Sequence, residues 1–300
     1  MSAKPVRFDN RVAIVTGSGR GLGREHALLL GRLGASVVVN SMTAATAQST
    51  ADDITRAGGK ATVHIGSVAD KAVADALVKK AIDTFGRVDI VINNAGYAEY
   101  LPFESLSHAQ LTDMLNTHIG GAFNVTQAAW PHMQKQKYGR VVMISSHAIF
   151  GMAYNTTYSP AKLGVVGLAK SLACEGKPHN IHVNAVATTG YSPSVEKNTK
   201  DEQMKSFLQQ NMPPSEPARM VAWLSHEDCV ANGEVFGAQG RVATKIFLAE
   251  THGFQGSRDG DWSVETIRDN WDQIVHEDGY HVYASTEELG NDLFKRIAGA

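Results

Sequence analysis

The feature that most limits the fold of this chain is the alternation of short apolar runs with helical patterns over its first two-thirds. Six segments of strand length are apolar on consecutive residues: Val12–Val15, Ser36–Val39, Ala61–Ile65, Ile90–Ile92, Val141–Ile144 and Ile181–Val186. Such runs are typical of parallel strands buried on both faces. Helical patterns separate them, at Leu22–Leu33, Thr46–Arg56, Lys71–Phe85, Leu111–Gln136 and Tyr158–Cys174. Repeated β-α-β units predict an α/β fold with a doubly wound parallel sheet.

The pattern changes after Thr188. Residues 189–217 are rich in Ser, Asn, Lys and Pro, with one helical patch near Met204–Gln209. A connection this long inside a compact domain is usually functional, so we expect a lid at 189–217. A short helix near Val221–Leu224 and a strand near Glu234–Phe236 follow. We expect one main domain at 8–250. A C-terminal extension at 251–300, helical at Val264–Ile274 and Thr286–Ile297, should pack on the same domain.

Composition excludes several classes of protein. The 28 basic and 30 acidic side chains nearly cancel, which argues against nucleic-acid and membrane-surface partners. No apolar run is long enough to span a bilayer, the N-terminus lacks a signal-peptide pattern, and the final AGA is not a peroxisomal S-K-L address. Two cysteines make no disulfide framework, and the twelve histidines are scattered, so we expect no metal site. The expectation is a cytoplasmic globular protein.

A glycine-rich loop joins the first strand to the first helix. Gly17, Gly21 and Gly23 give the spacing G-x-x-x-G-x-G. Glycines here allow a tight turn and let backbone N–H groups approach a diphosphate at the positive end of a helix. The alternative is a turn that only packs the helix on the strand. The residues expected to contact a dinucleotide in this loop are Thr16, Gly17, Ser18, Arg20, Gly21, Leu22 and Gly23.

The end of the second strand bears on cofactor choice. An acidic residue about 20 positions beyond the glycines normally bonds the ribose 2′-OH of NAD. Here the strand ends in Asn40 and Ser41, and no Asp or Glu occurs between Glu25 and Asp52. Arg20 is suited to a bidentate contact with a 2′-phosphate, and Asn40 and Ser41 to further hydrogen bonds. NADP(H) is favoured; NAD(H) is the alternative, with Arg20 solvated and Ser41 on a plain ribose.

A tyrosine and a lysine four residues apart open the helix after the fifth strand, as Tyr158-Ser-Pro-Ala-Lys162. Positions i and i+4 share one helix face, so the phenol and the ammonium can serve one site. A nearby cation favours the phenolate, giving a general acid/base able to move the hydroxyl proton of an alcohol. Pro160 places the helix start close by. The pair follows Ser145-Ser146 at the carboxyl end of a strand, where open α/β sheets bind ligands.

These motifs together resemble the short-chain dehydrogenase/reductase family. TGSGRGLG, Asn93-Asn94-Ala95-Gly96, ISS and YSPAK occur in the family's order. AAWPHMQKQKYGRVVMISS, SLACEGKPHNIHVNAVA and VAWLSHEDCVANGEVF resemble the 3-hydroxyacyl-CoA dehydrogenase domain of peroxisomal multifunctional β-oxidation enzymes. WSVETIRDNWDQI resembles the C-terminal extension of that subgroup, so the resemblance runs from about Asp9 to Ile297. It implies a Rossmann-type fold.

The resemblance also assigns roles to residues. It makes Tyr158 the acid/base, and Lys162 the residue that lowers its pKa and holds the nicotinamide ribose. Strand register selects Ser146 for the substrate oxygen, whereas the family's spacing to Tyr selects Ser145. His118 stands where the family has a catalytic Asn and could bond backbone or water in a proton relay. The remaining implied cofactor contacts are Ser67, Val68, Asn94, Ala95, Gly96 and Thr189.

The predicted function is NAD(P)(H)-dependent interconversion of a secondary alcohol and a ketone. A 3-hydroxyacyl-CoA is one candidate substrate, and a hydrophobic free alcohol, such as a steroid or an aryl carbinol, is another. A non-catalytic dinucleotide sensor is the rival from a different class. A lyase or epimerase would need a second base, for which His118 and His147 are the candidates. The family resemblance implies a homodimer or homotetramer.

Overall fold

The computed structural model describes residues 5–191, 193–257, 260 and 262–298. The chain divides into two compact units, Met1–Lys245 and Ile246–Ala300. The predicted boundary at 250/251 lies five residues later than the observed one.

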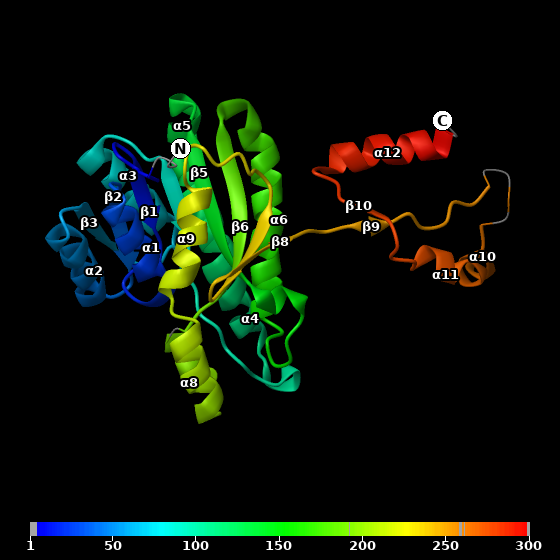
Figure 1. Ribbon diagram of the computed structural model, residues 1–300, viewed down its shortest axis with the longest axis horizontal. Helices are drawn as coiled ribbons and strands as arrows, with labels where there is room; N and C mark the ends of the chain where they lie inside the picture. The colour runs from blue at the N-terminus through cyan, green and yellow to red at the C-terminus, as the bar shows by residue number, and fades with distance from the viewer. Residues whose placement is uncertain (1–4, 192, 258–259, 261, 299–300) are drawn as a thin grey trace. The chain divides into compact units, whose positions relative to one another are not determined.

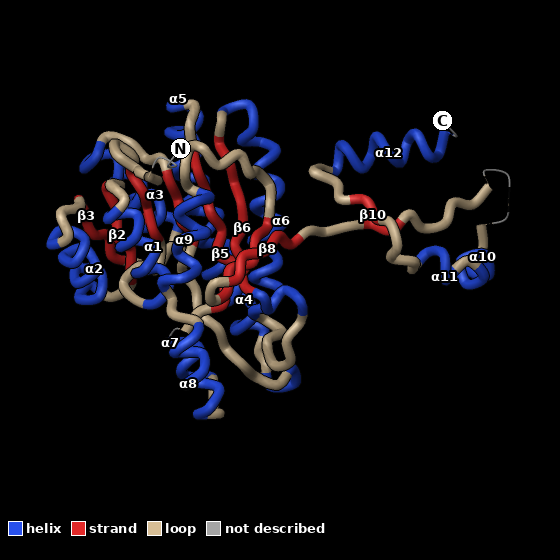
Figure 2. The backbone as a smooth tube through the Cα atoms, in the orientation of Figure 1, coloured by secondary structure: helices blue, strands red, loops and turns tan. Residues whose placement is uncertain are grey.

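The first unit is built on one eight-stranded sheet, in the order β3-β2-β1-β4-β5-β6-β7-β8 (Figures 1 and 2). Its strands are β1 (Val12–Val15), β2 (Ser36–Ser41), β3 (Lys60–Ile65), β4 (Ile90–Asn93), β5 (Gly139–Ser146), β6 (Ile181–Thr189), β7 (Val235–Gln239) and β8 (Val242–Ile246). The first seven pair in parallel. The strand order reverses between β1 and β4, which places a crevice for ligands at their carboxyl ends. The predicted doubly wound Rossmann-type fold is confirmed.

Helices cover both faces of this sheet. On one face α1 (Gly21–Arg32) packs against α2 (Ala44–Arg56) and α9 (Ser215–Leu224). On the other, α3 (Lys71–Phe85), α5 (Gly121–Gln136) and α6 (Tyr158–Gly176) lie side by side. The segment between β6 and α9 contains α7 (Pro193–Asn198) and α8 (Glu202–Asn211). This segment is the predicted lid.

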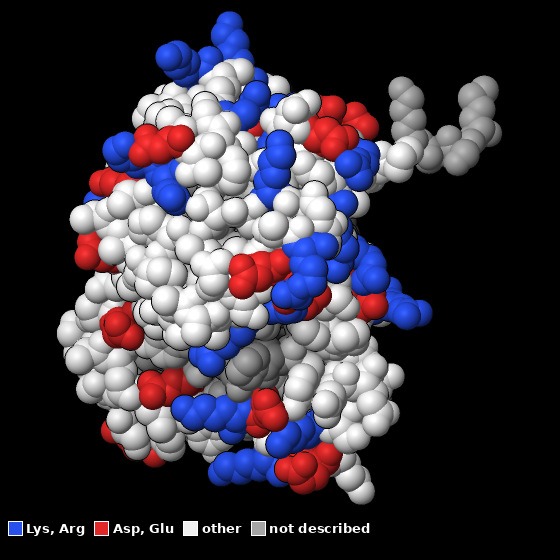
Figure 3. All heavy atoms as spheres, turned by 90° about the vertical axis from the view of Figure 1, so that its left-hand side faces the viewer, with Lys and Arg blue, Asp and Glu red and all other residues white. Residues whose placement is uncertain are grey.

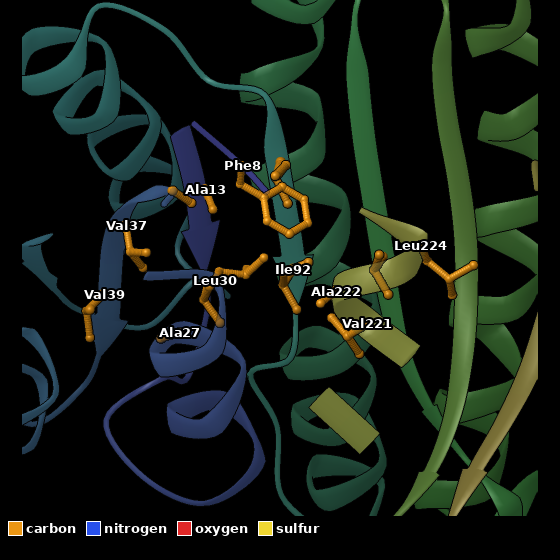
Figure 4. Packing of buried hydrophobic residues seen from close by; sticks show 14 of the residues in the cluster. Phe8, Ala13, Ala27, Leu30, Val37, Val39, Ile92, Val221, Ala222 and Leu224 are labelled. Carbon is orange, nitrogen blue, oxygen red and sulfur yellow. The ribbon is translucent and has the colours of Figure 1, made fainter. Parts of the chain in front are cut away.

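The core on the α1 side of the sheet holds the glycine loop in place. Leu30 of α1 and Val221 of α9 are both about 1% exposed and lie over Ile92 of β4 (Figure 4). Val37 and Val39 of β2 are fully buried in the same cluster. Burial of these apolar side chains therefore stabilises the sheet through the hydrophobic effect.

Basic and acidic side chains are interspersed over the surface shown in Figure 3, so neither sign of charge dominates that face.

The sequence predicted one helix at Leu111–Gln136, and this prediction is wrong, because the structure has three successive helical segments there. The chain forms α4 (His108–Leu115), a π-helical turn at Asn116–Gly120, and then α5. A π-helical turn inserts one extra residue into a helix and is frequent at functional sites. Here it brings His118, only 3% exposed, into the interior. The predicted helix Val264–Ile274 is also two short helices, α10 (Val264–Asp269) and α11 (Trp271–Ile274).

The second unit also contains a two-stranded pair, β9 (Glu250–Thr251) with β10 (Tyr280–His281), and α12 (Thr286–Ala298). None of its described residues is fully buried. That it packs on the catalytic domain stays a prediction. Across the described part of both units, no helix has the length and apolar character needed to cross a membrane.

Candidate active site

The glycine loop forms an open cradle at the start of α1. Gly17 and Gly21 have φ angles of +62° and +58°, which disfavour any side chain. A Cβ on Gly23 would lie 2.3 Å from Asn94 Nδ2 and 2.5 Å from the Gly17 carbonyl oxygen. Arg20 is the N-cap residue of α1, and its side chain makes no capping bond. The positive end of α1 therefore remains available to an anion, and these residues fit a dinucleotide diphosphate.

Hydrogen bonds tie the carboxyl ends of β1 and β4 together behind this loop. The Thr16 hydroxyl accepts from the backbone N–H groups of Asn94 and Ala95, each at 2.9 Å. The Asn94 side chain donates in return to the carbonyl oxygens of Thr16 at 2.9 Å and Gly17 at 3.3 Å. Thr16 is 1% exposed. Its side chain thus shapes the crevice from behind.

Two residues that were expected to contact the cofactor, Asn40 and Ser18, are buried and hydrogen-bond other groups of the protein. Asn40 is 2% exposed; its side chain accepts from Gly17 N–H at 3.3 Å and donates to the carbonyl oxygens of His64 and Gly66. The Ser18 hydroxyl is fully buried and donates to the Val15 carbonyl at 2.6 Å. The expectation that the side chain of Asn40 donates to a cofactor phosphate is therefore corrected, because its amide already holds the loop. Any contact from Ser18 is limited to its backbone.

Ser41 lies beside the glycine loop. A Cβ on Gly19 would lie 2.7 Å from Ser41 Oγ. That hydroxyl accepts from Thr43 N–H at 3.2 Å and lies 3.3 Å from Thr46 Oγ1. The end of β2 therefore presents neutral hydroxyl groups to the crevice, where a carboxylate would select against a 2′-phosphate.

The reactive groups lie where β5 ends and α6 begins. α6 begins at Tyr158, so Pro160 occupies its first turn as predicted. The Lys162 Nζ lies 5.5 Å from the centre of the Tyr158 ring and donates to the Ile144 carbonyl at 2.7 Å. Burial raises the pKa of Tyr158, and a hydrogen bond to the Ser146 side chain acts in the opposite direction. Phenol, ammonium and serine hydroxyl thus share one site.

The neighbouring serine is differently placed. Ser145 is 1% exposed, and its hydroxyl donates to the Lys162 carbonyl oxygen at 2.8 Å. That bond anchors the first turn of α6 to β5. The pairing with Tyr158 therefore favours Ser146 as the substrate-binding serine.

Burial dominates the protonation of the central pair. It raises the pKa of Tyr158 to about 12, an effect that the Ser146 bond only partly offsets. It also lowers the pKa of Lys162 to about 7. Burial thus acts on the phenol in the direction opposite to the lysine effect expected from the sequence. At neutral pH the Tyr158 hydroxyl is protonated, and the Lys162 amine titrates near neutrality.

His118 lies against the same phenol. Its ring meets the Tyr158 ring edge-on, with centres 5.5 Å apart, and its Nε2 is 2.8 Å from the Tyr97 carbonyl oxygen. Burial first, and the charge of Lys162 second, lower the pKa of His118 to about 3. The imidazole is neutral at physiological pH. Because a carbonyl oxygen only accepts, Nε2–H is the donor in the contact with Tyr97. A place for His118 in a proton relay stays a prediction.

Three other predicted cofactor contacts, Ser67, Val68 and Thr189, have these surroundings. Val68 is 3% exposed, and its carbonyl accepts from Asn124 at 3.2 Å, while Ser67 precedes it, half-buried. The Thr189 hydroxyl lies 3.1 Å from His147 Nδ1. No group of three His, Cys, Asp or Glu within the described ranges is arranged to hold a metal ion.

One cavity of about 400 Å³ joins the glycine loop to the reactive groups. Its walls are Gly17, Arg20, Gly21, Leu22, Gly23, Asn94, Gly96, Tyr97, Ala98, His118, Ile144, Ser145, Tyr158, Lys162, Thr188 and Lys197. Most of these were predicted from the sequence. Lys197 was missed, because nothing in the sequence pattern marks it.

Comparison with known proteins agrees with this geometry. The family model described as short chain dehydrogenase matches residues 11–204. The mouse peroxisomal multifunctional enzyme type 2 is 38% identical over 91% of this chain, which spans only 37% of that protein. The solved Drosophila melanogaster enzyme of the same name superposes with a TM-score of 0.83 at 31% identity, over 98% of this chain and 50% of the other.

A bacterial relative matches a shorter stretch at higher identity. The (2S)-[(R)-hydroxy(phenyl)methyl]succinyl-CoA dehydrogenase subunit of Thauera aromatica is 41% identical over 60% of this chain and 73% of its own length. The name of that relative describes a CoA thioester that carries a secondary alcohol next to a phenyl ring.

Proposed function

The chain belongs to the short-chain dehydrogenase family and is an oxidoreductase acting on CH–OH groups; from that premise we propose that it interconverts a 3-hydroxyacyl-CoA and the corresponding ketone. The observation that carries the proposal is the cavity that joins the open end of α1 to Tyr158 and Lys162, where the Tyr158 side chain is hydrogen-bonded to Ser146. A nicotinamide dinucleotide is the cofactor of the family, and when bound it accepts or donates the hydride.

The residues of the chain account for the proton and for orientation. The Tyr158 hydroxyl, protonated at neutral pH, is placed to donate its proton to a ketone oxygen during reduction. In the oxidation direction the hydroxyl must first lose its proton, and the phenolate then accepts the proton of the alcohol. Ser146 hydrogen-bonds the same substrate oxygen and fixes its position, which offsets several kcal/mol of orientational cost. Lys162 has a pKa of about 7, so its amine can gain or lose a proton beside the phenol at little energetic cost near neutral pH.

Two lines support an acyl-CoA substrate. The chain resembles the β-oxidation subgroup over nearly its whole length, and the Thauera relative is named for a hydroxyacyl-CoA thioester. Large exposed apolar side chains also follow Ser146 in the chain: Phe150, Met152 and Tyr154 are 70%, 53% and 61% exposed. An uncovered apolar stretch beside a reactive centre fits an aliphatic or aromatic substrate body.

The same apolar stretch favours a second candidate, a hydrophobic free alcohol such as a steroid or an aryl carbinol. A free alcohol lacks the CoA phosphates, so the two substrate classes differ in their dependence on salt. The family match argues against the non-catalytic dinucleotide sensor that the sequence left open, as does the hydrogen bond between the Tyr158 and Ser146 side chains.

We further propose a preference for NADP(H) over NAD(H). The neutral end of β2 and the exposed Arg20 at the cavity support it. For the assembly we propose a homodimer or homotetramer, and for location the cytoplasm.

The test replaces one oxygen atom. Tyr158→Phe keeps the ring that packs on His118 and removes the proton donor. We expect turnover of 3-hydroxyacyl-CoA to fall at least about a thousandfold, with dinucleotide binding, followed by reduced-nicotinamide fluorescence, within about threefold of wild type. Turnover retained by this variant would remove Tyr158 from the mechanism. A wild-type protein that binds dinucleotide yet converts no acyl-CoA, steroid or aryl carbinol would favour the sensor.

A further inference from the structure

The cavity carries positive charge from more than one element. Arg20, Lys162 and Lys197 line it, and none of its lining residues is acidic. Lys162 is 5% exposed and donates to the Ile144 carbonyl, so its charge lies deep, beside Tyr158. Arg20 and Lys197 are exposed, at the opening. An anionic ligand is therefore expected along the whole cavity.

Lys197 reaches this cavity from the lid. It lies on α7, between Thr189 at the end of β6 and the start of α8. The base of this segment lies close to the first turn of α1, since a Cβ built on Gly190 would be 3.1 Å from Leu22 Cδ2. Tyr191 N–H donates to the Met212 carbonyl at 2.7 Å, which joins the two ends of the segment. α7 therefore presents Lys197 to the same cavity that the first turn of α1 lines.

Neither exposed cation is neutralised by a neighbour. In the part of the chain that the structure describes, no ion pair joins Arg20 or Lys197 to a carboxylate. Other exposed cations of the same domain are paired, as Arg219 is with Glu216 at 2.7 Å. Two unpaired cations around one cavity repel each other, and a bound anion removes that repulsion.

We propose that Lys197 is a cofactor-binding residue, which contacts the diphosphate of the dinucleotide from the lid while the N-terminus of α1 contacts it from the sheet. The inference rests on the proposed function, in which this cavity holds the dinucleotide. An ammonium on a flexible stem offers three rotatable donors, which suits a phosphate approached from a separate element. Cofactor binding and lid position are coupled in this arrangement, because the contact exists only with α7 over the loop.

A CoA substrate also carries phosphates, so the same chemistry has a second source. The cofactor is favoured because Lys197 shares its cavity with Gly17, Gly21 and Gly23, the loop that forms the diphosphate cradle. Contact with CoA instead would affect the substrate and leave cofactor binding unchanged. The experiment must therefore measure both.

The test compares Lys197→Gln with Lys200→Gln, an exposed lysine of the same segment that does not line the cavity. NADPH and NADH are titrated by fluorescence at low and high salt, without substrate, and circular dichroism checks the fold. For Lys197→Gln we expect Kd for both cofactors to rise about tenfold at low salt. The difference in Kd between this variant and wild type should become smaller at high salt, because salt screens the charge of Lys197. Lys197→Arg should restore most of the affinity, and Lys200→Gln should stay within about twofold.

Three results separate the possible failures. Unchanged Kd and salt dependence in Lys197→Gln would overturn the inference. Unchanged Kd with a raised KM for a 3-hydroxyacyl-CoA, but not for its N-acetylcysteamine analogue, would assign Lys197 to CoA and also overturn it. A wild-type protein that binds neither dinucleotide would instead refute the proposed function.

Discussion

The imidazole of His118 occupies the space that a side chain at position 96 would need. A Cβ on Gly96 would lie 2.0 Å from His118 Cε1 and 2.5 Å from Nδ1. Because the same ring contacts Tyr158 edge-on and bonds the Tyr97 carbonyl, Gly96 and the acid/base are joined through one side chain. His118 thus acts as a positioning residue with a neutral ring.

Gly96→Ala should therefore damage both stability and turnover. Although Gly96 itself is exposed, an added methyl group would overlap the buried His118 ring. Overpacking usually costs about 1–3 kcal/mol, and displacement of His118 should lower kcat about tenfold or more. Urea unfolding and steady-state kinetics measure the two effects. Gly167→Ala is the matched control, since nothing lies within 4 Å of a Cβ placed there. Adding His118→Ala to Gly96→Ala should restore part of the stability; equal unfolding midpoints for Gly96→Ala and Gly167→Ala would contradict the packing argument.

Substitution of the two adjacent serines, Ser145 and Ser146, by alanine should have different effects on stability and turnover. Ser146→Ala removes the hydroxyl paired with Tyr158, and we expect kcat to fall about a hundredfold with dinucleotide Kd unchanged. Ser145→Ala removes only the bond to the Lys162 carbonyl, so it should lower the free energy of unfolding by about 1 kcal/mol and change kcat a few-fold. A larger loss of kcat in Ser145→Ala would move the substrate contact to Ser145.

Ser41→Asp should weaken NADPH binding. A carboxylate at the end of β2 repels a 2′-phosphate and accepts from a ribose hydroxyl. Asp can keep the bond from Thr43 N–H that Ser41 now accepts, so the local fold should survive. We expect Kd for NADPH to rise at least about tenfold, with NADH within about threefold, and a smaller change in Thr43→Asp. Equal weakening of both cofactors would mean that Ser41 does not face the 2′-position.

Buried histidines should make the protein acid-sensitive. Burial lowers the pKa of both His26 and His118 to about 3, from the ordinary 6.5. Between these values the unfolded chain binds protons that the folded chain does not, so stability falls as pH drops below 6.5. At pH 5 each contributes a loss of up to about 2 kcal/mol.

The variant His26→Leu isolates one of these contributions. Neither ring nitrogen of His26 has a hydrogen-bond partner in the described structure, so Leu breaks no bond. Urea unfolding at pH 7 and pH 5 should show a smaller loss of stability in His26→Leu than in wild type. His108→Gln, at an exposed position, should behave as wild type. Identical pH dependence in all three proteins would show that His26 titrates normally.

Much of the fold could be predicted because the sheet is buried on both faces. In β1 and β4 every residue is buried, so consecutive apolar residues marked them. β8 was missed for the opposite reason: it is an edge strand whose Val242, Thr244 and Lys245 are exposed, so it carries no apolar run. The π-helical turn was missed because one extra helical residue leaves the apolar pattern continuous through Leu111–Gln136.

The site could be predicted where backbone geometry dictates the residue type. It was harder to predict where a side chain can hydrogen-bond either the cofactor or the protein itself. The positive φ angles of Gly17 and Gly21 require glycine, so spacing alone located the cradle. Asn40 was taken for a cofactor ligand because an amide suits either role, and only the fold shows its oxygen held by Gly17 N–H. Lys197 lies far along the chain, in a segment whose sequence gives no period, and only the fold places it at the cavity.

The Thr16 hydroxyl, with its two amide donors, has a consequence for how ligands are received. Since it joins β1 to β4 through groups of the protein alone, we expect this part of the crevice to be ordered before a ligand binds, with little conformational entropy left there to lose. Amide hydrogen exchange around residues 16–17 and 94–95 should then be slow in the free protein and nearly unchanged by dinucleotide, with new protection concentrated in 189–217.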